Sequence, residues 1–345
     1  MTNNQKPQGE TNMRSSHSLR RSLGMAFALA LSVGLGAGMA AAQDKSKSNL
    51  KVLVFSVNGA SPTIKQMVDS AAADAKSRGW TVETYDGNGD QVATNNQVNT
   101  YITRGFNALI NIASDNNQMG AVIANAKKAG IPFVSTFSGM APGITVDIGS
   151  NNVMDGVIAA SEMVGRINGT GHVVKLNWNV LPALQERDRG FWAVVKEYPN
   201  IKVTEVELKV PGQVEDAYNQ LTNLLTANKD IVAVWAGWNE PGIASVRAIE
   251  QAKREKDVFV VDMDGSPAEF DLIRRGSPLV LNVAYDVPGM GVAAVKAVAD
   301  AVDGKTFPAR QIYKKPCRIT KESVPAAGQS PDFKSCRLFS GDATD

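Results

Sequence analysis

Short apolar runs alternate with segments of helical periodicity along most of the chain. The run KVLVFSV at 51–57 is apolar and rich in β-branched residues, which is typical of a buried strand. Apolar residues then recur at helical spacing from Ile64 to Ala75, and Gly79 marks the end of a predicted helix over 62–78. The same order of strand, helix and glycine then begins again, so the chain consists of repeated strand–helix units.

Two series of these units follow one another. The first has further strands predicted at 80–85, 108–112 and 131–135 and helices at 91–104 and 117–129. A long helix over 153–167 opens the second series, whose predicted strands are 172–176, 202–207, 232–235, 258–261 and 279–283. Its helices are predicted at 182–197, 214–227, 241–252 and 268–274, and a last helix over 288–302 precedes a strand around Ile312. Such alternation predicts an α/β fold with two parallel sheets, each covered by helices on both faces.

The first 42 residues have the pattern of an export signal. A basic segment with three arginines precedes an apolar run over 23–39, and three alanines at 40–42 form a small-residue cleavage site. We therefore expect the mature chain to begin near Gln43, in the periplasm. An uncleaved membrane anchor is the alternative, and Arg20-Arg21 leave open whether export uses the general or the twin-arginine route.

The mature chain is long enough for two lobes. About 300 residues exceed what one hydrophobic core usually serves. We expect an N-terminal lobe over 49–152 that is completed by about 286–310, and a C-terminal lobe over 153–285 that is completed by about 311–345. No linker rich in Ser, Gly or Pro separates the two halves, which indicates that they share hinge strands.

Charge argues against a polyanionic partner. Removal of residues 1–42 takes away four basic and one acidic residue, so the counts of 36 and 34 become 32 and 33, a net charge of −1. This balance is not that of a protein that binds nucleic acid or anionic lipid.

The two cysteines lie close together near the C-terminus. In an oxidising compartment, Cys317 and Cys336 are predicted to form a disulfide that fixes the tail. A metal site is the alternative, but His172 is the only histidine of the mature chain, so a Cys/His site cannot be completed. Because no cysteine lies near the cleavage site, we expect a free periplasmic protein of a Gram-negative bacterium without a lipid anchor.

Seven segments in a fixed order carry a resemblance to a known family. They are SVNGASP, GFNALINIASD, AGIPFVSTF, VDIGSNN, LQERDRGF, AVWAGWNEP and VVDMDGSP. Their order is similar to that of the periplasmic sugar-binding proteins of the ribose-binding type, which serve ABC importers, and the match covers roughly residues 50–310. The resemblance implies a type I architecture, in which two lobes joined by three crossings close on a small solute. It also implies a membrane permease as partner, a monomer, and neither cofactor nor catalytic residues.

The resemblance also implies where the solute binds. Arg187 in LQERDRGF and Asp264 in MDGSP fall on the family's ligand-binding arginine and second-lobe aspartate. A guanidinium offers a rigid fork of donors to hydroxyl or carboxylate oxygens, and a carboxylate accepts from paired hydroxyls. Ser56 and Ser61 lie in the loop where the family has Ser or Asn, and Thr63 lies where the family often has an aromatic residue. The simpler alternatives are a solvated helix residue for Arg187 and a turn residue for Asp264.

Three departures replace polar groups of the family by rings. Phe137-Ser138 stand where the family has Asp-Arg, Trp238 with Asn239 stands at the place of an asparagine, and Tyr285 replaces a glutamine. Aromatic faces stack on the C–H side of carbohydrates, so a sugar or polyol remains the leading ligand class. The substitutions also favour an alternative, a non-sugar solute such as an autoinducer-like signal or a nucleoside. Simple core packing is the other interpretation of Phe137 and Trp238.

The expected mechanism is hinge closure around an unchanged solute. Trp178 and Asn177, at the end of the strand over 172–176, are further candidates for the cleft. Two alternatives in other classes stay open. One is a ligand sensor that feeds a membrane receptor, and the other is a hydrolase in which Asp264 and Glu240 act as a carboxylate pair.

Overall fold

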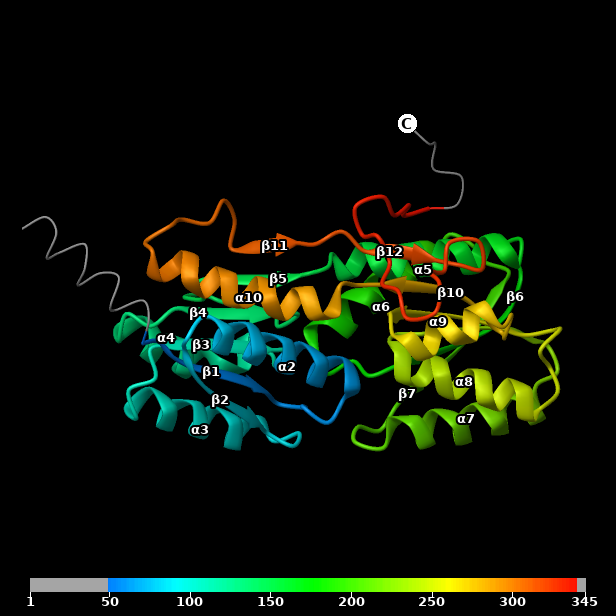
Figure 1. Cartoon of the computed structure of the whole chain (residues 1–345). Coiled ribbons are helices and arrows are strands. Elements are labelled where there is room, and N and C mark those ends of the chain that lie inside the picture. The colour runs from blue at the N-terminus through cyan, green and yellow to red at the C-terminus, as the bar shows by residue number, and fades with distance from the viewer. Residues whose placement is uncertain (1–48, 340–345) are drawn as a thin grey trace, which may run out of the picture. The chain divides into compact units, whose positions relative to one another are not determined.

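The computed structural model of the chain describes residues 49–339. The predicted export signal at 1–42 lies outside these residues. Within them the chain forms two six-stranded sheets flanked by helices, and each sheet with its helices constitutes one lobe (Figure 1). The predicted α/β class with two lobes is confirmed.

The N-terminal lobe contains a fully parallel sheet in the order β11-β5-β4-β3-β1-β2. Its strands are β1 (Lys51–Ser56), β2 (Thr81–Asp86), β3 (Ala108–Ile112), β4 (Phe133–Thr136), β5 (Val146–Gly149) and β11 (Gln311–Tyr313). Its helices are α2 (Pro62–Ser77), α3 (Gln91–Thr103), the 3₁₀ helix η1 (Asn116–Met119), α4 (Gly120–Lys128) and α10 (Val287–Val302). The central strand β3 is buried on both faces, whereas the edge strand β2 is largely half-buried, as expected for a parallel sheet between helix layers.

The C-terminal lobe contains a sheet in the order β12-β10-β9-β8-β6-β7. Its strands are β6 (Gly171–Asn177), β7 (Ile201–Glu207), β8 (Ile231–Ala236), β9 (Phe259–Asp264), β10 (Leu279–Ala284) and β12 (Cys317–Ile319), and only β12 pairs antiparallel among them. Its helices are α5 (Asn152–Arg166), α6 (Pro182–Val195), α7 (Gln213–Ala227), α8 (Asn239–Gln251) and α9 (Pro267–Arg274).

Local sequence signals set where the helices begin. Proline occupies the first turn of α2, α6, α9 and α10, where its missing N–H costs no hydrogen bond. Side chains cap other helices: Asp90 accepts from the N–H of Ala93 at 2.8 Å, and Asn151 accepts from the N–H of Met154 at 3.1 Å. These signals explain why most predicted elements agree with the structure within a few residues. The short strand β5 was missed, because four residues carry little periodicity.

The chain crosses between the lobes three times. The crossings lie between β5 and α5, between β10 and α10, and between β11 and β12. The strand predicted around Ile312 is β11, which pairs with β5 in the N-terminal sheet. The chain from residue 311 on was expected in the C-terminal lobe, and this assignment is wrong for β11. The physical reason is that a three-residue edge strand does not encode which sheet it extends. The next strand, β12, joins the C-terminal sheet and carries Cys317, whose predicted disulfide with Cys336 is confirmed.

Two glycines bring α5 and α6 into close contact. A Cβ atom on Gly156 would lie 2.1 Å from the carbonyl oxygen of Arg187, and one on Gly190 would lie 2.1 Å from the carbonyl oxygen of Val153. Only glycine permits this backbone approach. The pair of glycines therefore fixes α6, and with it the backbone of Arg187, against α5.

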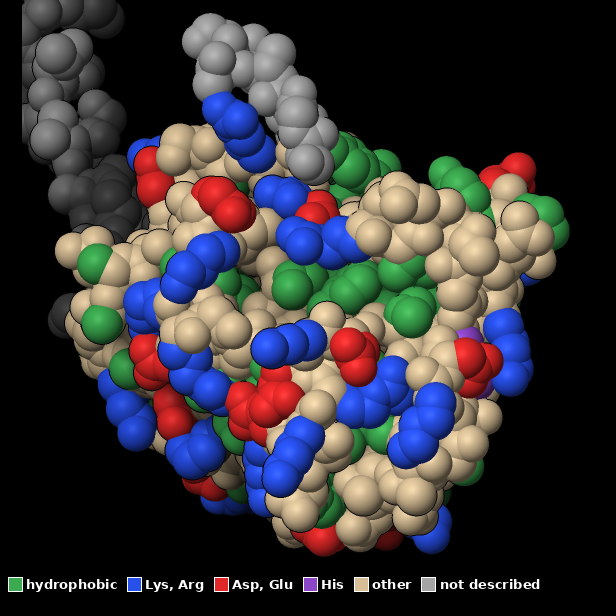
Figure 2. Space-filling model, turned by 90° about the vertical axis from the view of Figure 1, so that its right-hand side faces the viewer, with side chains coloured by type: hydrophobic (Ala, Val, Ile, Leu, Met, Phe, Trp, Pro, Cys, Tyr) green, Lys and Arg blue, Asp and Glu red, His purple; other side chains and the backbone are tan. Residues whose placement is uncertain are grey.

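Charges of both signs are interspersed on the face of the molecule that Figure 2 shows, in keeping with the small net charge. Between residues 49 and 339 the structure contains no helix that is long and apolar enough to cross a membrane.

Candidate ligand-binding site

A cavity of about 70 Å³ lies between the lobes at the carboxyl ends of their strands. Parallel α/β sheets generally place their ligands at this edge. Ser61 and Thr63 reach the cavity from the start of α2, and Trp238 from the start of α8. Seven of the predicted site residues line it, namely Ser61, Thr63, Phe137, Arg187, Trp238, Asp264 and Tyr285.

Three predicted residues lie outside this lining. The hydroxyl of Ser56 accepts from the N–H of Asn58 at 3.1 Å, and that of Ser138 donates to the carbonyl of Thr136 at 3.0 Å. Asn239 is buried in the first turn of α8. A direct neighbour lines the cavity in place of Ser138 and of Asn239, namely Phe137 and Trp238, whereas Asn58, two positions on, lines it in place of Ser56.

Arg187 and Asp264 form the charged centre of the site. Nη1 of Arg187 lies 2.9 Å from Oδ1 of Asp264 and donates to the carbonyl of Gly237 at 2.7 Å, while Nε donates to Oδ1 of Asn152 at 3.3 Å. The arginine is only 4% exposed. Burial alone lowers the pKa of Arg187, but nearby acidic groups, Asp264 among them, raise it above its usual value. The guanidinium is therefore charged, fixed and already paired.

Aromatic rings surround this pair. The ring centroids of Phe137 and Tyr285 are 5.4 Å apart with a tilt of 50° between their planes. The guanidinium of Arg187 lies 5.2 Å from the centroid of the Tyr285 ring, a cation–π contact. Trp178 and Trp238 also line the cavity. Asn177, the other further candidate, is buried and does not line the cavity.

Three cavity residues have unusual backbone conformations. Ala113 and Phe137 have φ of 52° and Asp264 has φ of 97°, although none of them is glycine. Each follows or ends a strand that points at the cavity. Left-handed non-glycine residues are uncommon and concentrate at functional sites, where the surrounding structure holds them.

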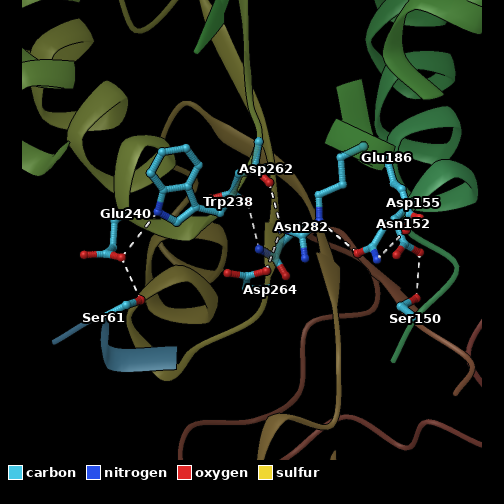
Figure 3. A network of polar contacts seen from close by, with 12 residues as sticks. Ser61, Ser150, Asn152, Asp155, Glu186, Trp238, Glu240, Asp262, Asp264 and Asn282 are labelled. Carbon is cyan, nitrogen blue, oxygen red and sulfur yellow. Dashed lines mark hydrogen bonds and ion pairs between the residues drawn. The ribbon is translucent and has the colours of Figure 1, made fainter. Parts of the chain in front are cut away.

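Buried carboxyl groups support the site from behind. Burial raises the pKa of Asp155, which accepts from the hydroxyl of Ser150 at 2.9 Å, to about 7. Behind Asp264, the Asn282 amide donates to Asp262 at 2.7 Å (Figure 3). The same amide also donates to Glu269. Burial raises the pKa of both Asp262 and Glu269 well above the usual values. Two buried carboxylates that bond one amide would repel each other, which favours the protonated form of one of them.

Glu240 links the two lobes. Its Oε2 accepts from the hydroxyl of Ser61 at 3.0 Å and from Nε1 of Trp238 at 3.3 Å (Figure 3). Its Oε1 accepts from the side-chain amide of Gln213 at 2.7 Å. The sequence suggested Glu240 only as one member of a carboxylate pair and gave no sign that it faces Ser61 across the cleft. In the structure Glu240 lies in the first turn of α8, where the helix dipole favours an acidic residue.

The arrangement is suited to holding a small solute. Over residues 49–339 there is no group of three or more His, Cys, Asp or Glu side chains that could hold a metal ion. The donors and acceptors of the cavity come from both lobes, so a solute between them would contact both.

Comparison with known proteins agrees with this geometry. The sequence model of a family described as "Periplasmic binding protein domain" matches residues 52–306. The chain is 29% identical over 229 residues to the D-apiose import binding protein of Paraburkholderia graminis, which covers 65% of this chain and 72% of that protein. It is 24% identical over 270 residues to the ribose import binding protein of Escherichia coli, with coverage of 77% and 88%.

A solved structure shows the same fold. It is that of an ABC transporter solute binding protein from Mycobacterium smegmatis with bound glycerol, at a TM-score of 0.74 and 25% identity. The alignment covers 82% of this chain and 98% of that one.

Proposed function

The chain belongs to the periplasmic binding protein domain family, and on that premise we propose that it is the solute-binding component of an ABC importer for a sugar or small polyol. The observation that carries this proposal is the cavity between the lobes, where Arg187 and Asp264 of one lobe face Ser61 and Thr63 of the other. A solute that contacts both walls stabilises the closed arrangement of the lobes, because only that arrangement supplies all of its contacts.

The size of the cavity favours a small polyol. A volume of about 70 Å³ is several times the roughly 10–15 Å³ that a cavity needs to hold a single water molecule. The proteins that this chain resembles include binders of apiose and ribose and one structure with glycerol. A second candidate is a less hydroxylated, non-sugar solute, since aromatic and aliphatic side chains such as Phe137, Trp178 and Ile64 form much of the lining.

The cellular role follows from the same proposal. The protein is exported to the periplasm, the signal is removed near Ala42, and the mature chain acts as a monomer that presents its closed lobes to a membrane permease. It releases its solute chemically unchanged, so Asp264 and Glu240 accept hydrogen bonds rather than act as acid and base. A sensor role would use the same closed lobes with a receptor as partner.

A ligand screen tests the proposal. Thermal unfolding of the mature protein is measured with tetritols, pentitols, pentoses, inositols and nucleosides, and each hit is followed by calorimetry. A ligand at a hundredfold excess over its Kd stabilises the folded state by about 2.7 kcal/mol, which is readily measured. If the hits are nucleosides alone, the second candidate replaces the first. Recovery of a cleaved product after incubation would refute the proposal that the protein only binds.

Stacking on Trp238 provides a second measurement. Ligand binding should change indole fluorescence, and most of the affinity should remain in Trp238→Phe, which keeps a ring. Trp238→Ala should cost about 1–3 kcal/mol of binding free energy. If Trp238→Ala lowers only the melting temperature, this residue belongs to the core and the aromatic wall has no part in binding.

A further inference from the structure

The cavity carries one negative charge that no cation among residues 49–339 balances. Three charged side chains line it: Arg187, Asp264 and Glu240. Arg187 and Asp264 neutralise each other at 2.9 Å. Within residues 49–339, no Lys, Arg or His nitrogen lies within 4.0 Å of the Glu240 carboxylate, so the lining has a net charge of −1.

The partners of Glu240 hold its carboxylate in place without neutralising it. Ser61, Trp238 and Gln213 donate to it at 3.0, 3.3 and 2.7 Å, and all three are uncharged. The start of α8 adds the favourable field of a helix N-terminus. Glu240 is only 8% exposed, and a buried carboxylate without a cation is costly unless something else supplies the opposite charge.

The surroundings favour a cation at this place. Trp178 and Trp238 line the cavity with Leu181, Leu184 and Val210. An apolar wall lowers the local dielectric constant and strengthens attraction between opposite charges. Indole faces also attract cations in their own right. A neutral hydroxyl group of a solute would gain less than a cation from the low dielectric constant and from the indole faces.

We propose that Glu240 forms a subsite for a protonated amine, so that the solute is a small polyol or sugar derivative with an amino group. The amine faces Glu240, and the hydroxyl groups face Arg187 and Asp264. This inference rests on the proposed function, since it names the chemistry of the solute in the same cavity.

Pairs of solutes that differ only in one group test it. They are glycerol with 2-amino-1,3-propanediol, and ribitol with 1-amino-1-deoxyribitol, each titrated by calorimetry into the protein at pH 7, where an aliphatic amine is protonated. The amine of at least one pair should bind at least tenfold more tightly than its hydroxyl counterpart. Added salt should weaken the amine more than the neutral solute, although burial limits that effect.

A matched pair of variants assigns the preference to one residue. Glu240→Gln removes the charge at constant size and should abolish the preference for the amine. Glu255→Gln makes the same change of charge at an exposed position outside the cavity and should leave the preference intact. The comparison within each pair of solutes uses the wild-type protein, so it stands even if Glu240→Gln does not fold.

The outcomes separate the two proposals. Equal or tighter binding of the neutral member of each pair overturns the amine subsite and leaves the proposed function in place. A preference that survives in Glu240→Gln also overturns it. If no polyol, sugar or amino derivative binds at all, both the proposed function and the amine subsite fail.

Discussion

Replacing Arg187 by methionine should lower the free energy of unfolding by about 3–5 kcal/mol, even without a solute. The reason lies in what the arginine leaves behind. The side chain of Asp264 is only 9% exposed, and Arg187 is its only ion-pair partner within residues 49–339. Removal of the arginine therefore leaves the buried carboxylate of Asp264 without a positive partner. It also leaves the carbonyl of Gly237 without the donor that lies at 2.7 Å. Methionine has a similar volume, so loss of packing contributes little.

Urea unfolding followed by circular dichroism measures the effect, and two further variants identify its cause. Arg189→Met removes an arginine from the same helix, but its side chain is 60% exposed and its pair with Glu186 is 3.5 Å long, so the loss should stay below about 1 kcal/mol. Adding Asp264→Asn to Arg187→Met removes the unpaired charge and should therefore restore part of the stability. Asparagine is suitable at this position because it also tolerates positive φ.

Two results would refute this reasoning. The first is an Arg187→Met protein within about 1 kcal/mol of wild type, which would mean that water or a rearrangement already compensates Asp264. The second is a double variant that is less stable than Arg187→Met alone. Either result would show that the pair is not the buried ion pair that its distances and burial indicate.

Three other predictions concern the lobes and the tail. Burial raises the pKa of Asp155 from 3.8 to about 7, so the folded state binds this proton more tightly than the unfolded state. Stability should therefore fall as pH rises from about 4 to about 7, and Asp155→Asn should flatten this slope in pH-dependent unfolding, whereas an unchanged slope would reject the assignment. Gly156→Ala should lower the free energy of unfolding by about 1–3 kcal/mol, because the added methyl group clashes with α6. Gly165→Ala in the same helix places its methyl group in open space and should raise the free energy of unfolding by about 0.5–1 kcal/mol. Equal effects of the two substitutions would contradict the close contact between α5 and α6. Thiol labelling of the native protein should detect neither Cys317 nor Cys336, and replacing both by serine should cost about 3 kcal/mol for a loop of 19 residues; two reactive thiols would disprove the bond.

Local patterns in the sequence were sufficient for most of the elements and their order. The apolar run of β1 and the helical spacing after Pro62 are properties of adjacent residues, which is why strand–helix units could be predicted without tertiary information. The disulfide could be predicted as well, because Cys317 and Cys336 had no competing partner. The strand β5 and the sheet to which β11 belongs could not be predicted, because three or four residues are too few to show a hydrophobic periodicity.

Seven of the ten residues predicted from the sequence line the cavity, and the other three lie one or two positions from a residue that does. The sequence placed candidates after the ends of the strands, where a parallel fold exposes its loops. The backbone angles after each strand decide which of two neighbouring side chains lines the cavity. Secondary-structure propensities do not determine these angles. The φ of 52° at Phe137 belongs to the turn in which that ring lines the cavity while the hydroxyl of Ser138 bonds a backbone carbonyl.

The sequence by itself determined the α/β class, the two lobes, the family and the short list of polar and aromatic residues near the cleft. Only the tertiary structure decided that Arg187 is paired with Asp264 and that Glu240 has no cation beside it in the described part of the chain. The physical reason is distance along the chain. Ser61 and Glu240 are 179 positions apart, and their hydrogen bond exists because two separately folded sheets meet at their carboxyl ends. Charge balance and burial depend on contacts between residues that are far apart in the sequence, whereas the periodicity of a strand or helix depends only on its own residues.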